Sequence, residues 1–261
     1  MINFEISPAA FEFLDFKVSY YFLVYILGFF LVLYFVLKAA EKKEINMRKE
    51  QVYDLAILSV LGIIIGARVF HVLFWNFDYY TENILRIFYL WEGGFSFHGG
   101  LMGGILVLFF YTKYKKIDVL KLLDVAIVPV VLVLAFGRIA NFLNGENLGI
   151  ATNVPWCVVF ENAEGCRHPT QLYAALGRVG LFFLLLFIKT MKKYKEGFLF
   201  WNFVLFSGIG RFFLDFFVEK EEYFFLGVGQ WFSLAMMIAG IYFISKHYEK
   251  NLNNLFKKVA R

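Results

Sequence analysis

The sequence has little of what metal and thiol sites are built from. Its 261 residues include two cysteines and four histidines, and Cys157 and Cys166 are not spaced with histidines as metal ligands are. The pattern predicts no metal site, and we expect no cofactor. Both cysteines fall in one segment, where they could form a disulfide or remain two free thiols.

Two further features are missing. The N-terminus lacks the basic region of a cleavable secretory signal, since Glu5, Glu12 and Asp15 precede an apolar run that is too long for one. The sequence has no convincing internal repeat. It also has no pair of interrupted apolar segments at matching positions. Both patterns are typical of transporters built from inverted repeats, so their absence argues against that class.

What the sequence does contain is apolar. It is 60% hydrophobic and 21% aromatic, with a mean hydropathy of +0.64. Runs close to the length that spans a bilayer recur with little between them. The pattern predicts an all-α polytopic membrane protein with one membrane domain, 1–261, and seven transmembrane helices. The expected spans are 18–37, 52–75, 95–112, 119–137, 170–188, 197–217 and 224–244.

The basic residues alternate between the connections. Four segments, 38–50, 113–121, 189–195 and 246–261, hold 18 of the 26 lysines and arginines. By the positive-inside rule these segments are cytoplasmic, so the N-terminus lies outside and the C-terminus is cytoplasmic. The net charge of +5 is therefore a topology signal, and we expect no nucleic-acid partner.

Two segments extend the outer side. Residues 76–94 are aromatic and mildly amphipathic, which predicts an interfacial arm. Residues 138–169 are long enough to form a small outward-facing head. Gly99 and Gly103, four residues apart in the third span, would let another helix or a lipid chain approach the backbone closely.

Ionisable groups from four spans are expected at one depth near the outer interface: Arg68, His98, Arg138 and Arg211, with Asp215 one helical turn from Arg211. Taken singly, each has an ordinary explanation: a snorkelling arginine, a core histidine or a structural ion pair. Taken together, they favour a site for a lipid headgroup, because guanidinium groups bind phosphate bidentately.

The stretch GRIANFLNGE, 137–146, places further polar groups there. Arg138 and Asn141 share a helical face, and Asn144-Gly145 is a helix-ending turn signal. Glu146 then falls just beyond the helix end. The carboxylate could hold Arg138 or accept hydrogen bonds from hydroxyl groups.

At these residues the sequence resembles the prolipoprotein diacylglyceryl transferase family, whose signature is G-R-x-G-N-F-x-N-x-E. Further blocks match in order along nearly the whole chain. They are YFLVYILGF at 21–29, GAR at 66–68, SFHGGL at 96–101, HPTQLY at 168–173, RFFLDF at 211–216 and GQWFSLAM at 229–236.

The resemblance implies a multi-pass enzyme of the bacterial inner membrane with its active site toward the outer leaflet. Such an enzyme transfers the diacylglyceryl group of phosphatidylglycerol to the lipobox cysteine thiol of a prolipoprotein. A thioether forms and glycerol phosphate leaves. The partners would be phosphatidylglycerol, prolipoprotein lipobox peptides and membrane lipid.

The resemblance and the chemistry together assign roles to individual residues. A thiol of pKa about 8.5 attacks as the thiolate, so His98 is expected to remove its proton. Arg138 and Arg211 would stabilise the charge of the leaving phosphate. The expected lipid-binding residues are Tyr21, Arg68, Gly99, Asn141, Asn144, Glu146, Gln171 and Asp215, the last of which orients Arg211.

Some positions depart from the family pattern. Ala140 replaces a glycine, Asp215 replaces a glutamate, Ala174 stands where glutamate is usual, and Val218 where arginine is common. They leave open an inactive or repurposed homologue that binds lipid or lipoprotein. A third alternative is a polytopic transporter, whose path would use charged groups deeper in the spans: Asp54, Asp124 and Arg178.

Overall fold

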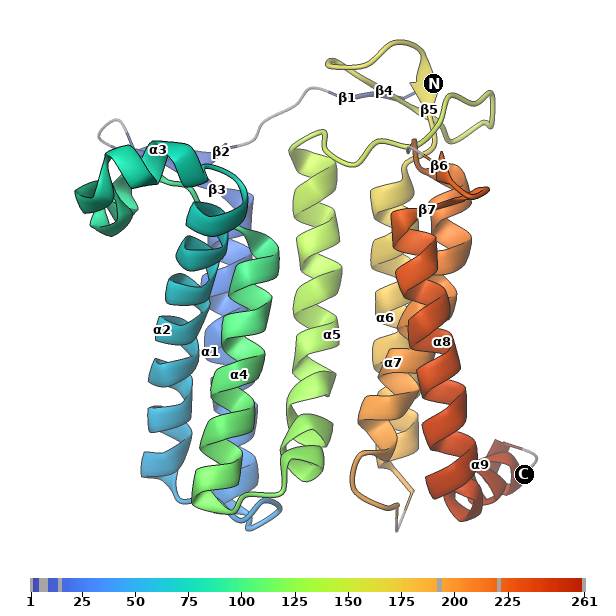
Figure 1. Ribbon diagram of the computed structural model, residues 1–261. Coiled ribbons are helices and arrows are strands. Elements are labelled where there is room, and N and C mark those ends of the chain that lie inside the picture. Colours follow the sequence, from blue (N-terminus) through green and yellow to red (C-terminus); the bar gives the residue numbers. More distant parts are fainter. Residues whose placement is uncertain (1, 5–8, 14–15, 192–193, 220–221, 260–261) are drawn as a thin grey trace. The chain divides into compact units, whose positions relative to one another are not determined.

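A computed structural model describes residues 2–4, 9–13, 16–191, 194–219 and 222–259 (Figure 1). The basic segments 189–195 and 246–261 are therefore described only in part, and Glu5 and Asp15 lie outside the described residues. The chain forms two compact units, Met1–Val32 with Leu123–Arg261, and Leu33–Leu122, and each is considered by itself.

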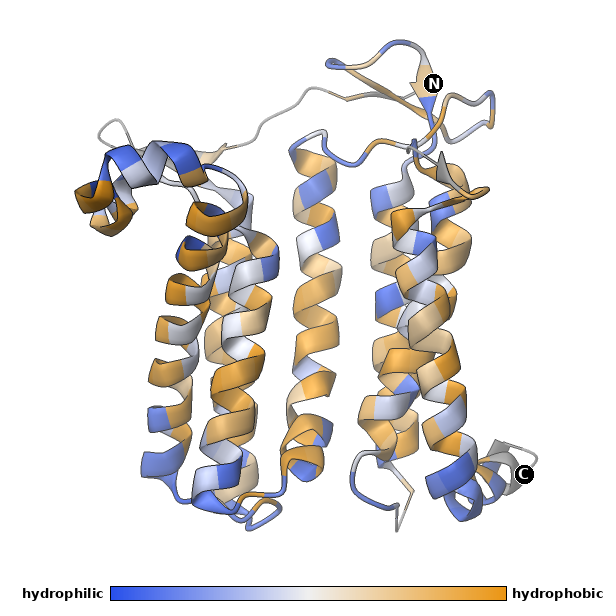
Figure 2. Ribbon diagram, viewed as in Figure 1, coloured by the Kyte–Doolittle hydropathy of each residue, from blue (hydrophilic) through white to orange (hydrophobic). Residues whose placement is uncertain are grey.

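Long helices dominate the described chain, and each expected span corresponds to one of them. They are α1 (Tyr20–Glu41), α2 (Lys49–Phe74), α4 (Phe97–Lys115), α5 (Val119–Leu143), α6 (Thr170–Lys189), α7 (Phe198–Leu214) and α8 (Val228–His247). Along these helices apolar residues predominate, and polar residues gather toward the ends and loops (Figure 2). In the described part of the chain six helices are long and apolar enough to cross a membrane, so this is a mostly helical multi-pass membrane protein.

The exception is α4, which coincides with the expected span 95–112. Four glycines, His98 and a basic last turn lower its hydropathy. Its helical structure is confirmed, whereas its crossing of the membrane stays a prediction.

The all-helical prediction left out short strands. The described residues also form three small sheets, made by β1 with β4 and β5, by β2 with β3, and by β6 with β7. These arise from short pairings across turns and chain ends, which hydropathy does not reveal. The smaller elements are β1 (Ile2–Phe4), β2 (Ala9–Phe13), β3 (Phe16–Ser19), α3 (Phe77–Glu82), η1 (Ile84–Phe88), η2 (Leu90–Glu92), β4 (Val158–Phe160), β5 (Cys166–Arg167), η3 (Asp215–Phe217), β6 (Glu222–Tyr223), β7 (Leu226–Gly227) and α9 (Glu249–Val259).

Glycines hold α2 and α4 together in the unit Leu33–Leu122. A Cβ atom at Gly99 would collide with the carbonyl oxygen of Gly66, and one at Gly103 with the carbonyl oxygen of Gly62. Of the two expected partners for these glycines, a helix or a lipid chain, the structure places a helix against them. Close backbone contact of this kind lets dispersion forces stabilise a helix pair in lipid.

We expect Gly103→Ala to lower the thermal stability of the protein in detergent, because backbone cannot move aside as a side-chain end can. Overpacking of this kind costs about 1–3 kcal/mol. Gly104→Ala is the matched control, since its Cβ would lie 3.2 Å from a side-chain carbon of Ile63, which can shift. Equal melting temperatures for the two variants would contradict this account of the helix contact.

The other unit has its apolar core at the end of the helices opposite the head. Asp124 of α5 caps α7 there, because its carboxylate oxygens accept hydrogen bonds from the N–H groups of Gly197 (2.7 Å) and Phe200 (2.8 Å). Asp124 is thus a buried structural group. The core cluster consists of Ile127, Val128, Val131, Leu181, Leu185, Ile188, Met191, Phe198, Leu199, Ile244 and Tyr248.

Candidate functional site

The chain reverses sharply after α5 and brings Glu146 back toward the helix. The N–H of Glu146 donates to the carbonyl of Asn141 at 2.9 Å, and that of Gly145 to the carbonyl of Phe142 at 3.0 Å. This pair of bonds is a Schellman motif, which requires a residue with a left-handed backbone conformation. Gly145 has that conformation, with a φ of 64°. The helix-ending turn predicted at Asn144-Gly145 is confirmed.

Glu146 is the centre of a hydrogen-bond network. Its Oε2 accepts from the Tyr21 hydroxyl (2.7 Å) and from Asn141 Nδ2 (3.2 Å), and its Oε1 accepts from Asn144 Nδ2 (3.2 Å). Its backbone carbonyl accepts from Gln171 Nε2 at 2.6 Å. Five residues expected to bind lipid, from α1, α5, the following turn and α6, are therefore Glu146 and its hydrogen-bond partners. We call them the Glu146 cluster.

The carboxylate of Glu146 is bonded to a hydroxyl and two amides, not to Arg138. Arg138 donates one long hydrogen bond, 3.4 Å, to Asn141 Oδ1. Its remaining guanidinium donors have no other hydrogen-bond partner among the described residues. Arg138 thus lies beside the Glu146 cluster with most of its donors available to a ligand.

Arg211 is held by Asp215, four residues along. Arg211 Nε lies 2.8 Å from Asp215 Oδ1, off the direction of an aligned hydrogen bond, so the pair is held mainly by charge. Asp215 is 2% exposed and follows directly on α7. A Cβ at Gly229 would come within 2.6 Å of Asp215 Oδ2, so a glycine in the first turn of α8 allows this approach. The N-terminus of α8 favours a nearby carboxylate.

A cavity of about 280 Å³ opens beside Arg211, between side chains of α5, α6, α7 and α8. Its lining is mostly apolar, with polar groups from Tyr173, Arg178, Ser207 and Arg211. Arg138 interacts electrostatically with Arg211 and with Arg178. An apolar cavity with a few cationic groups at its wall suits a lipid that carries a negative charge.

The HPTQLY segment connects this cavity to the head. Thr170 Oγ1 donates to the carbonyl of Asn147 at 3.1 Å, beside the bond from Gln171 to Glu146. The Tyr173 hydroxyl accepts from Trp156 Nε1 at 2.7 Å and lines the cavity. Sequence reasoning did not select Tyr173, although it lay within a matched block.

His98 lies in the other unit, at the second residue of α4. It is exposed and forms no hydrogen bond with the described residues, while its ring contacts Phe70 and Phe97. Together with His71, Trp75 and Ser96 it lines a pocket of about 450 Å³. An accessible imidazole without a fixed partner can accept a proton from an incoming group.

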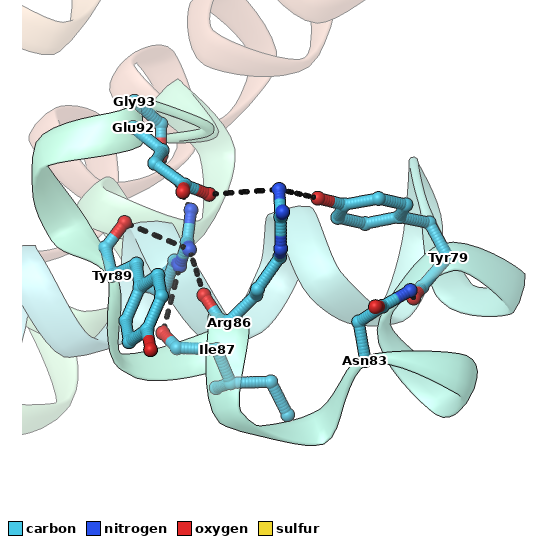
Figure 3. A network of polar contacts seen from close by, with 8 residues as sticks. Tyr79, Asn83, Arg86, Ile87, Tyr89, Glu92 and Gly93 are labelled. Atoms are coloured by element: carbon cyan, nitrogen blue, oxygen red, sulfur yellow. Dashed lines mark hydrogen bonds and ion pairs between the residues drawn. The ribbon is translucent and has the colours of Figure 1, made fainter.

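Arg68 has a different environment from the other arginines. It is 3% exposed, stacks on Tyr80, and donates to backbone carbonyls of residues 86–94. Figure 3 shows the carbonyls of Arg86, Ile87 and Tyr89 around one guanidinium, beside the contacts of Arg86 with Tyr79 and Glu92. The donors of Arg68 are thus used in holding the 76–94 segment in shape. Gly99, also expected to bind lipid, packs against α2.

Cys157 and Cys166 form a disulfide, which settles the alternative left open by the sequence. The bond joins the residue just before β4 to the first residue of β5, its antiparallel neighbour within the head. Since the sequence contains only these two cysteines, the chain has no free thiol in this state. A thiol nucleophile would have to come from a substrate.

Comparison with known proteins agrees with this picture. The family model described as prolipoprotein diacylglyceryl transferase matches residues 8–246. Proteins named phosphatidylglycerol--prolipoprotein diacylglyceryl transferase are similar over nearly their full length. That of Geobacter sulfurreducens is 36% identical over 91% of this chain and 94% of its own, and that of Bordetella parapertussis 38% over 90% and 93%. The relative from Polynucleobacter asymbioticus is 34% identical over 95% and 98%. This chain belongs to the prolipoprotein diacylglyceryl transferase family.

Proposed function

We propose that this protein transfers the diacylglyceryl group of phosphatidylglycerol to the lipobox cysteine thiol of prolipoproteins. The thiolate sulfur attacks the carbon of the diacylated glycerol that is bonded to the phosphate oxygen. This carbon–oxygen bond breaks, and the phosphate leaves with the other glycerol as glycerol phosphate. A thioether forms, and the thiol proton passes to a base. The observation that carries the proposal is the Glu146 cluster, which lies beside Arg138 in a chain whose family relatives are named for this reaction.

Arg138 and Arg211 act on the leaving group. Charge builds up on the phosphate oxygen as the carbon–oxygen bond breaks, and fixed guanidinium donors stabilise it more in the transition state than in the bound lipid. Asp215 keeps Arg211 in one orientation through the 2.8 Å ion pair, so little reorganisation is needed during the reaction. His98 takes the proton of the incoming thiol.

The Glu146 cluster positions the polyol headgroup. A carboxylate accepts hydrogen bonds from glycerol hydroxyls, and Tyr21, Asn141 and Asn144 fix its direction. Gln171 holds the backbone of Glu146. Arg68 contributes indirectly by shaping the arm 76–94, and Gly99 by allowing α4 to pack on α2.

We further propose that the protein lies in the bacterial inner membrane with seven crossings, its N-terminus outside and its C-terminus cytoplasmic. The basic segments support this orientation through the positive-inside rule. The site and the head 138–169 then lie on the outer side of the membrane. Lipobox peptides would reach it from that side, and no nucleic acid takes part.

The direct test uses the purified protein in detergent with phosphatidylglycerol and a lipobox peptide. We expect release of glycerol phosphate that depends on the peptide thiol, and a peptide whose mass increases by one diacylglyceryl group. A peptide with serine in place of the cysteine is the control. No release by folded, lipid-bound protein would favour the repurposed homologue instead.

The Glu146 cluster gives a separate prediction. We expect Glu146→Gln to raise the KM for phosphatidylglycerol and lower turnover, together roughly 10- to 100-fold in kcat/KM, because hydrogen bonds to a charged acceptor contribute roughly 1.5–3 kcal/mol. Glu161→Gln removes an exposed carboxylate from the same head and should change neither constant. Wild-type kinetics in Glu146→Gln would contradict the assigned role.

The transporter alternative loses two of its three supporting residues. Asp124 caps α7, and Asp54 lies 3.4 Å from the Tyr111 hydroxyl, so both have structural partners. Arg178 remains, and it lines the same cavity as Arg211.

A further inference from the structure

Two guanidiniums line the cavity, those of Arg211 and Arg178, and the mechanism proposed for the reaction does not use Arg178. It lies in the ninth position of α6, outside every matched sequence block. Its NH1 donates to the carbonyl of Ala174, one helical turn nearer the head, at 3.1 Å. The side chain therefore extends toward the head end of α6, as helical side chains usually do.

Arg178 has no carboxylate partner in the described part of the chain. Its one hydrogen bond is to a backbone carbonyl, and the residue four positions earlier, where a helical ion pair could form, is Ala174. The walls around it are mostly apolar, with Leu181 and Phe206 among them. A partly buried cation without a counter-charge is unfavourable, which points to a ligand that supplies the charge.

The surrounding charges also favour an anion. Arg178 interacts electrostatically with both Arg138 and Arg211. The two carboxylates of this region, Glu146 and Asp215, are already engaged by the Glu146 cluster and by Arg211. Three positive guanidiniums and two negative carboxylates leave one net positive charge. One phosphodiester, which carries a single negative charge, would neutralise it.

Depth along the helices is compatible with a shared ligand. At 1.5 Å per residue, Arg178 begins roughly 12 Å from the start of α6, Arg138 roughly 7 Å from the end of α5, and Arg211 roughly 5 Å from the end of α7. The bond to Ala174 shows that the Arg178 side chain reaches back by one turn. The guanidinium of Arg178 therefore lies closer than its Cα atom to the level of Arg138 and Arg211 along the helices.

We propose that Arg178 is a substrate-positioning residue that binds the phosphodiester of the anionic lipid in the cavity it shares with Arg211. The proposal rests on the function proposed above, because it takes phosphatidylglycerol as the occupant. Arg178 holds the lipid in place before and during the reaction, so its contribution is to binding more than to the chemical step.

The test compares Arg178→Gln, Arg178→Lys and Ala174→Glu in the purified full chain. We expect Arg178→Gln to raise the KM for phosphatidylglycerol about tenfold, the worth of one charge-assisted hydrogen bond, with kcat within about twofold. Arg178→Lys should restore most of the affinity because it keeps the charge. Ala174→Glu places a carboxylate one turn from Arg178 and should reproduce the loss while leaving Arg178 itself intact. Leu176→Ala, on the exposed side of α6, is the control for disturbance of the helix.

A second readout does not depend on turnover. Phosphatidylglycerol should raise the melting temperature of the wild-type protein, and by less in Arg178→Gln, whereas uncharged diacylglycerol should shift both proteins equally. The proposal would be overturned if Arg178→Gln had the wild-type KM and the wild-type shift in melting temperature with phosphatidylglycerol. It would also be overturned if inorganic phosphate raised the melting temperature of the wild-type protein as much as phosphatidylglycerol does. A different result would separate the two proposals. If phosphatidylglycerol raised the melting temperature more in wild type than in Arg178→Gln, but the wild-type protein showed no turnover, the transferase function would be refuted and the anion site supported.

Discussion

Replacing Arg138 by alanine is expected to lower kcat about 10²–10³-fold, the usual effect of removing a fixed donor from developing negative charge. Arg138 has one long hydrogen bond, to Asn141. This bond positions its guanidinium and leaves most of its N–H donors available to the leaving phosphate. The thermal stability of the variant should be close to that of wild type, because no ion pair of Arg138 is lost. Release of glycerol phosphate, measured at saturating phosphatidylglycerol and peptide, provides the measurement.

Arg138→Lys separates charge from geometry. A lysine keeps the charge but cannot form two parallel hydrogen bonds to a phosphate, so we expect only partial recovery. Arg48→Ala, an exposed arginine at the start of α2, controls for the loss of one positive charge and should remain fully active. Near-normal kcat in Arg138→Ala would mean that the leaving phosphate is stabilised elsewhere.

His98→Ala is expected to lower the rate about 10²–10³-fold near pH 7, within the range of general base catalysis. At that pH a lipobox thiol of pKa about 8.5 is mostly protonated, so the base supplies the thiolate. As the pH rises toward 9, the thiol ionises unaided and the deficit of the variant should shrink. Parallel pH–rate profiles from pH 6 to 9 for wild type and variant provide the measurement.

Two results would revise this assignment. A loss that stays constant across the pH range would show that His98 contributes as a hydrogen-bond donor or by packing, and a negligible loss would place deprotonation elsewhere. His247→Ala, at the last residue of α8, serves as the control because it removes an exposed histidine that lies outside the matched blocks. It should leave both the rate and the profile unchanged.

How much the sequence revealed depended on how local each feature is. GRIANFLNGE encodes a helix end, a turn and a returning carboxylate within ten residues, so the neighbourhood of Arg138, Asn141 and Glu146 followed from spacing. Tyr21 and Gln171 are remote in sequence, and only the family resemblance connected them with Glu146.

Other features were beyond the reach of spacing. The use of Arg68 depends on where the carbonyls of residues 86–94 fall, which hydropathy cannot show. The disulfide depends on the register of β4 with β5. Arg178 looked like a mid-span charge, and its relation to Arg211 required the packing of α6 against α7.

The pairing of β1 with β4 has a consequence for the number of crossings. Residues 2–4 run alongside residues 158–160 in one parallel ladder, so both segments occupy the same aqueous compartment. The path between them must therefore traverse the bilayer an even number of times. If α1, α2 and α5 cross, an even number predicts that α4 crosses as well, despite its glycines. With three later crossings, by α6, α7 and α8, we expect the C-terminus in the opposite compartment from the head.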